Sequence, residues 1–226
     1  QLRNSSGEAD THGLSNELVD SFLKIDPNLN IALDLAIKAR ENLDDEVEDL
    51  LVSLNESQFA RELQKDFVNF YEPSTVNPYI PLAAKGPWII TTHGAVVHDN
   101  GGYGMLGMGH DPTEVMSSMS KSHVMANVMT PSVTHKRFAD TLKREVGHTR
   151  GACPFDRFIC MNSGSESVTV AMRISDINAR LMTDQEGPHQ GKEIWTVALD
   201  SGFHGRTDRP ASITSTSLPK YQKKLA

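Results

Sequence analysis

The apolar positions in the N-terminal third of the chain repeat with the period of a helix. They recur three or four residues apart in two successive segments: Val47, Leu50, Leu51 and Leu54, then Phe59, Leu63, Phe67 and Phe70. This spacing places the side chains on one face of a helix. We therefore expect two to four short helices between residues 15 and 71. Residues 1–14 are rich in Ser, Gly and Asp, and this composition predicts a loose segment.

The pattern changes between residues 72 and 112. Residues 72–85 contain three prolines and show no period, which indicates an extended linker. Two β-prone runs, Trp88–Thr92 and Ala95–His98, flank the pair His93-Gly94, and this arrangement predicts a hairpin. A glycine-rich loop follows over residues 99–111.

The last part of the chain alternates between helical and strand-like segments. The pattern predicts helices over 113–125 and 134–146, a buried strand over 155–161, a turn over 162–166, a helix over 168–182, a second buried strand over 194–199 and a turn over 201–207. Strand, turn, helix and strand in this order are typical of a βαβ unit. The sequence therefore predicts an α/β domain.

Charge is distributed unevenly along the chain. The 226 residues carry a formal net charge of −7. Residues 1–66 hold 15 acidic and 6 basic side chains, a balance of −9, whereas the remainder holds 14 and 16, a balance of +2. The acidic region is interpreted as a solvated helical surface, with a dimer edge or a substrate channel as alternatives. No basic stripe is present, so a nucleic acid is not expected as a partner.

The cysteines and the longest apolar runs bear on the cellular compartment. Cys153 and Cys160 are separated by six residues and have no second pair, so neither a disulfide framework nor a cysteine metal site is expected. The apolar runs are far shorter than a membrane span, and no signal-peptide pattern opens the chain. These features favour a cytoplasmic protein that does not associate with a membrane.

The turn over residues 162–166 is the first candidate site. A predicted strand ends there, Ser163-Gly164-Ser165 follows, and a long helix begins. Free backbone N–H groups and the positive end of the dipole at a helix N-terminus suit a phosphate group. Gly164 permits close approach, and the two serine hydroxyls can donate hydrogen bonds. The alternative is that a serine only caps the helix, with Glu166 completing a capping box.

The turn over residues 203–207 is the second candidate site. Phe203 lies just beyond the end of a predicted strand, where an aromatic ring can stack on a flat heteroaromatic ligand. His204 can hydrogen-bond to a substituent of such a ring or orient a neighbour. The alternative is a packed Phe203 beside a surface histidine and a structural Arg206.

Taken together, the two turns resemble those of the class III aminotransferases. Members of that family carry an Asn-Ser-Gly-(Ser/Thr)-Glu-(Ala/Ser) turn followed by a Phe-His-Gly-Arg-Thr turn, and residues 162–167 and 203–207 match these in order and context. Asp99 and residues 109–112 (Gly-His-Asp-Pro) are similar to the family's Asp-x-x-Gly…Gly-His-x-Pro segment. After Thr207 the family usually continues with a small residue, a glycine and a strand, whereas this chain continues Asp-Arg-Pro.

The resemblance implies a fold-type I architecture, in which a mostly parallel sheet carries helices on both faces beside a smaller domain. Applied to this chain, it implies an acidic helical segment over 1–71, a linker, hairpin and glycine-rich loop of the small domain over 72–112, and the first part of the cofactor-binding α/β domain over 113–226. It also implies pyridoxal 5'-phosphate as cofactor. In family terms, the turn that contains Ser163, the backbone N–H groups of Gly164 and Ser165, and the Ser165 hydroxyl would bind its phosphate.

The remaining site residues follow from the same resemblance. Phe203 would stack on the pyridine ring, His204 would lie beside it, and Glu166 would support the cofactor. The family's Schiff-base lysine, and the aspartate that pairs with the pyridinium nitrogen, lie far downstream of the Phe-His-Gly turn, and no lysine here matches that position. We therefore expect this chain to be an N-terminal half that is inactive alone. A second chain, a longer polypeptide or a repurposed fragment would each explain this.

The resemblance implies an enzyme that transfers an amino group between an amino acid or amine donor and an oxo-acid or aldehyde acceptor. Decarboxylases, racemases and aminomutases of the same family share the cofactor cradle and remain alternatives. A non-catalytic partner subunit with a vestigial cradle and a different phosphate-ligand enzyme are alternatives of other classes. The family forms homodimers, so a homo-oligomer is implied.

Overall fold

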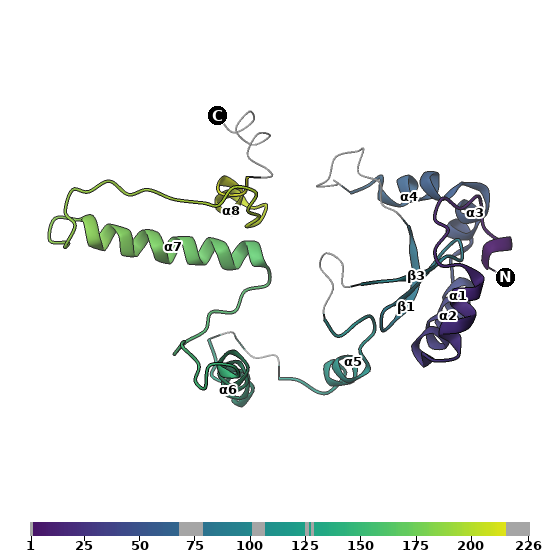
Figure 1. The fold of residues 1–226 in the computed structure, drawn as a ribbon, viewed down its shortest axis with the longest axis horizontal. Helices are drawn as coiled ribbons and strands as arrows, with labels where there is room; N and C mark the ends of the chain where they lie inside the picture. The colour runs from purple at the N-terminus through teal and green to yellow at the C-terminus, as the bar shows by residue number, and fades with distance from the viewer. Residues whose placement is uncertain (1, 68–78, 101–106, 125–126, 128, 216–226) are drawn as a thin grey trace. The chain divides into compact units, whose positions relative to one another are not determined.

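The computed structural model describes residues 2–67, 79–100, 107–124, 127 and 129–215, so residues 101–106 of the predicted glycine-rich loop lie outside the described residues. The chain divides into two compact units, residues 1–124 and 125–226 (Figure 1). No helix in the described ranges is long and apolar enough to cross a bilayer.

The first unit combines short helices with one small sheet (Figure 1). Its elements are the 3-10 helix η1 (Leu2–Asn4), the α-helices α1 (Asn16–Leu23), α2 (Pro27–Glu41), α3 (Asp45–Ser53), α4 (Glu56–Gln64) and α5 (Thr113–Met119), and the strands β1 (Pro81–Lys85), β2 (Trp88–Thr91) and β3 (Val96–His98). The strands form an antiparallel sheet in the order β1-β2-β3. The predicted hairpin is confirmed, and α1 to α4 confirm the prediction of two to four short helices between residues 15 and 71. Strand β1 lies at the end of the segment predicted to be an extended linker.

Side chains cap the helices of the first unit at their N-termini. Asp26 accepts a hydrogen bond from the Asn28 N–H, and Pro27 occupies the first position of α2, where no intrahelical donor is needed. Asn55 and Gln58 form a reciprocal capping box at the start of α4. These local signals explain where the helices begin.

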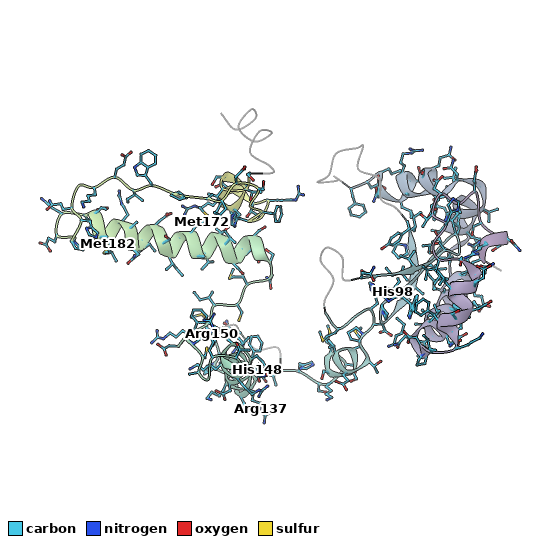
Figure 2. All side chains as sticks on the ribbon, in the orientation of Figure 1. His98, Arg137, His148, Arg150, Met172 and Met182 are labelled. Carbon is cyan, nitrogen blue, oxygen red and sulfur yellow. The ribbon has the colours of Figure 1, made fainter. Side chains whose placement is uncertain are left out.

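The core of the first unit forms where α2 packs across β1 and β2. Its buried members are Leu29, Ala32, Ala36, Trp88, Ile90 and Val96. Small residues on α2 allow the helix to approach the sheet closely. The Trp88 indole is almost fully buried and donates a 2.8 Å hydrogen bond to the Asp26 carboxylate. His98 packs edge-on against the same ring, with centroids 4.8 Å apart (Figure 2).

The segment before α1 is held against the rest of the first unit. The buried Glu56 carboxylate accepts hydrogen bonds of 2.8 and 2.7 Å from the N–H groups of Asp10 and Thr11. The Leu14 N–H donates to the Val96 carbonyl at 2.8 Å. These bonds order the segment that its composition predicted to be loose. The prediction failed because the acceptors lie far away in the chain and are not visible in the local sequence.

The second unit contains helices α6 (Val133–Gly147), α7 (Gly164–Thr183) and α8 (Asp208–Ser212). After α7 the chain turns and returns along that helix, and α8 packs against α7 (Figure 1). The predicted helices of this region are confirmed. The helix α8 was not predicted, and it stands where the family pattern continues with a strand.

The predicted strands over 155–161 and 194–199 are wrong for the described structure. Both segments lack strand assignment, and their apolar side chains are exposed: Ile159 is 64% and Val197 89% accessible. The sheet that the described residues form is antiparallel and lies in the first unit, so the expected parallel sheet is not present among them. A strand forms only when neighbouring strands pair with its backbone groups, and no such neighbour lies in the described part of this unit.

Replacing Trp88 with Phe should destabilise the first unit. The apolar packing is largely kept, but the Asp26 carboxylate loses its indole donor, so the free energy of unfolding should fall by about 1–2 kcal/mol at pH 7. The Trp88 N–H, followed by the Asn28 N–H, holds the pKa of Asp26 below its ordinary value. The stabilisation is therefore present above the ordinary carboxyl pKa of about 4 and is lost as the pH falls through the lowered pKa.

Denaturant unfolding at pH 7 and at pH 3 measures this effect. Trp195→Phe is the matched control, because Trp195 is 77% exposed and its replacement should change stability little. Equal unfolding free energies for the two variants at pH 7 would show that the indole–carboxylate bond does not stabilise the unit.

Candidate functional site

The N-terminus of α7 lies at the turn that the sequence predicted as a candidate phosphate-binding site. Ser163 is the N-cap residue, and its hydroxyl accepts a 3.2 Å hydrogen bond from the Glu166 N–H. The capping role is therefore confirmed. The N–H groups of Gly164 and Ser165 have no intramolecular acceptor within the described residues. Capping satisfies one donor and leaves these two adjacent donors for a ligand.

The space beside Gly164 is open. A Cβ atom built on this glycine would meet no atom within 4 Å. An anion can therefore approach the free N–H groups closely, and the positive end of the helix dipole favours its negative charge. The residues at this turn fit the phosphate group of the expected cofactor.

The turn over residues 203–207 lies directly against the start of α7. The Arg206 N–H donates a 3.3 Å hydrogen bond to the Ser165 hydroxyl. Gly205 adopts a φ of +129°, and a Cβ there would overlap the Ser165 hydroxyl and press on Pro210. Glycine is therefore required for this close approach. The structure thus brings together two turns that are about forty positions apart in the sequence.

Phe203 presents a partly open aromatic face. Its side chain is 47% exposed, and the Arg206 guanidinium carbon lies 5.7 Å from the ring centroid. A large exposed ring beside a candidate anion site is suited to stacking with a planar ligand. His204 is half-buried, and its backbone N–H donates to the Thr214 hydroxyl at 3.0 Å.

Glu166 lies in the first turn of α7. Its Oε2 atom is buried and has no hydrogen-bond partner in the described part of the chain. A carboxylate in the first helical turn is stabilised by the helix dipole. A buried acceptor without a donor is costly, so this atom is available to a donor group that a bound molecule would bring. The position therefore fits a supporting residue.

The third segment of the family resemblance lies in the first unit. The His110 ring and the Asp99 carboxylate are 3.0 Å apart. Gly109 approaches the Gly86 backbone so closely that a Cβ atom on Gly109 would clash with it. Next to this approach, Gly86 and His110 form an isolated antiparallel β-bridge. The Asp99 carboxylate and the His110 ring, which both belong to the segment that resembles the family, are thus in contact beside this close approach.

A cavity of about 530 Å³ borders α7 at Met172. Figure 2 labels this residue. Its walls include Met172, Thr196, Ala198, Arg209 and Ile213. The sequence pattern did not predict this cavity. The acidic residue and proline at the start of α8 are signals for a helix N-terminus that could have located one wall.

Comparison with known proteins gives a consistent result. The model of the family described as aminotransferase class-III matches residues 70–226. Among curated proteins, the acetylornithine aminotransferase of Prochlorococcus marinus subsp. pastoris is 36% identical over 75 residues, which are 33% of this chain and 16% of that enzyme. The chain thus matches about one sixth of that relative's length. No solved structure matches the chain.

Replacing Ser163 with Ala should loosen the first turn of α7. Loss of the N-cap acceptor should reduce local stability by about 1 kcal/mol, so the hydrogen-bonded amides of Glu166 and Ser167 should exchange about fivefold faster. Ser163→Asn should keep the protection, because Asn caps equally well. Hydrogen exchange with mass spectrometry measures this. Ser175→Ala, at an exposed position inside the same helix, is the control, and equal exchange in both alanine variants would contradict the capping role.

Proposed function

We propose that this chain forms the phosphate cradle and ring-stacking surface of an enzyme that transfers amino groups. The chain belongs to the class III aminotransferase family. Pyridoxal 5'-phosphate is the cofactor of this family. The observation that carries the proposal is the contact between the two turns, in which Arg206 N–H bonds to the Ser165 hydroxyl. This contact brings the two turns together, which supports one site that combines a free pair of N–H donors with an exposed aromatic ring.

Each residue has a distinct proposed role. The N–H groups of Gly164 and Ser165 bind the phosphate, and the Ser165 hydroxyl can donate to it while it accepts from Arg206. Ser163 caps α7 and so holds these donors in place. Phe203 covers one face of the pyridine ring. His204 lies beside the ring, and Glu166 supports it.

The cofactor, when bound, supplies an electron sink for negative charge at the carbon that bears the amine. The residues of this chain bind and orient it, and the helix dipole at α7 offsets part of the phosphate charge. Stacking by Phe203 excludes water from one ring face. None of these roles requires a proton to leave a side chain of this chain.

The lysine that bonds covalently to the cofactor is proposed to lie outside these 226 residues, together with the aspartate that pairs with the ring nitrogen. Lys192 precedes the ring-stacking turn, and Lys220 follows it closely. The chain alone is therefore proposed to be inactive. A separate polypeptide or a longer form of this one would complete the site.

The exposed apolar segments support a fold-type I arrangement for the complete protein. Ile159 and Val197 lie in extended stretches without strand neighbours in the described residues. We propose that strands from a separate polypeptide, or from a longer form of this one, pair with these stretches and cover α7. A homo-oligomer, a cytoplasmic location and an oxo-acid acceptor are further parts of the proposal. The acetylornithine aminotransferase match makes acetylornithine one amino donor to test.

The absorbance of the purified native protein tests the proposed function. A band in the range of roughly 330–430 nm that shifts when an amino donor is added is expected from bound pyridoxal phosphate. Intact-mass measurement should identify the polypeptide that carries the lysine. Protein that stays colourless with added cofactor, in the presence of that polypeptide, would contradict catalysis and favour a partner subunit with a vestigial cradle. A shift without formation of a new amino acid would favour a decarboxylase or racemase.

Replacing Gly164 with Val should weaken cofactor binding without unfolding the protein. The new side chain meets no protein atom near its Cβ, but it occupies the space beside the free N–H groups. We expect affinity for pyridoxal phosphate to fall about tenfold or more, a loss of about 1.4 kcal/mol. Titration followed by absorbance measures it.

Gly107→Val is the matched control for this substitution. Gly107 also has open space around its Cβ position, but it lies in the first unit. The control should bind the cofactor like the wild type. Equal affinity for both valine variants would exclude the start of α7 as the phosphate site.

A further inference from the structure

Thr214 is fully buried and its hydroxyl bonds directly to the ring-stacking turn, residues 203–207. Among the described residues, no other fully buried hydroxyl residue does so. Its Oγ1 accepts the His204 N–H at 3.0 Å and donates to the Pro210 carbonyl at 2.8 Å, with the Gly205 carbonyl 3.2 Å away. One hydroxyl therefore contacts three backbone groups. A buried hydroxyl with both its donor and its acceptor capacity used is rigidly oriented.

The following residue continues the same contact. The Ser215 N–H donates to the Gly202 carbonyl at 3.2 Å. The ring-stacking turn is thus bonded on one side by residues 214–215 and on the other by the Ser165 hydroxyl, which accepts from Arg206. Because both neighbours of Phe203 in the chain, Gly202 and His204, are held from residues 214–215, the position of the Phe203 ring depends on that pair.

The helix α8 holds Thr214 in this place. Pro210 and Ala211 are buried, and the Ala211 N–H donates to the Thr207 carbonyl at 2.8 Å. Arg209 forms an ion pair with Asp176, which attaches α8 to α7. The Asp-Arg-Pro sequence that departs from the family pattern therefore forms the helix whose end returns Thr214 to the turn.

We propose that Thr214 is a positioning residue that fixes the Phe203–Gly205 turn for contact with the cofactor ring. The proposal rests on the proposed function, because it assigns the purpose of the turn to ring stacking. Thr214 itself does not touch the ring. It acts by orienting the backbone of His204 and Gly205. This backbone in turn sets the positions of the Phe203 and His204 side chains.

The test compares Thr214→Val with Thr214→Ser in the native protein. Valine keeps the shape but loses the hydroxyl, whereas serine keeps the hydroxyl. Thr183→Val is the matched control, because the Thr183 hydroxyl donates to the carbonyl four residues earlier in α7 and contacts neither turn. Hydrogen exchange of residues 202–207 reports the order of the turn. Absorbance titration with pyridoxal phosphate reports the affinity and the spectrum of the bound cofactor.

We expect Thr214→Val to raise exchange of the His204 amide about tenfold and to weaken cofactor binding about five- to tenfold with a changed absorbance maximum, because one buried hydrogen bond is lost. Thr214→Ser should restore both measurements, and Thr183→Val should change neither. Two results would contradict the positioning role. In the first, Thr214→Val leaves exchange of the His204 amide unchanged. In the second, it speeds that exchange without altering the affinity for pyridoxal phosphate or the spectrum of the bound cofactor.

Failure of the proposed function has a different signature. A wild-type protein that binds no pyridoxal phosphate overturns the function, and with it the ring-positioning role. Exchange in the same samples would then show only whether Thr214 orders the turn. If Thr214→Val does not fold, the serine variant decides: full affinity and spectrum support the role of the hydroxyl, and their loss contradicts it.

Discussion

The contact between Ser165 and the Gly205–Arg206 backbone is the constraint on which the candidate site depends. The Ser165 hydroxyl accepts the Arg206 N–H, and the absence of a side chain at Gly205 allows the two turns to touch. Without this contact, a helix N-terminus and an exposed aromatic ring would be two unrelated features. With it, the start of α7 and the turn that carries Phe203 lie together, as the proposed site for a phosphorylated heteroaromatic molecule requires.

The two units differ in which side chains they bury. In the first unit, α2 and the hairpin bury Trp88 and Leu29, and polar groups in the interior are mostly paired, as in the Trp88–Asp26 bond. In the second unit, α7 buries none of its residues, and the buried positions cluster around α8 and Thr214. The order of the second unit therefore rests on hydrogen bonds around the two turns more than on an apolar core, which makes each of these bonds important to the site.

The exposed apolar stretches follow from the physics of strand pairing. Val197 and Ile159 lie in segments whose composition is that of buried strands, and the structure leaves them extended and accessible. A strand is stabilised by cross-strand hydrogen bonds and by layers on its faces, and local composition can only favour it. Neighbouring strands, such as those of the proposed fold-type I sheet, would supply both.

The sequence by itself determined the features that neighbouring residues encode. Helical periodicity, capping residues and the His93-Gly94 turn located the helices and the hairpin. The strings around Ser165 and Phe203 identified the family and predicted a candidate site. Tertiary structure alone decided the rest. Three contacts join segments that lie ten to more than sixty positions apart: Trp88 with Asp26, Ser165 with Arg206, and Thr214 with His204. Local periodicity carries no record of such contacts, because they depend on which surfaces meet after the elements have formed.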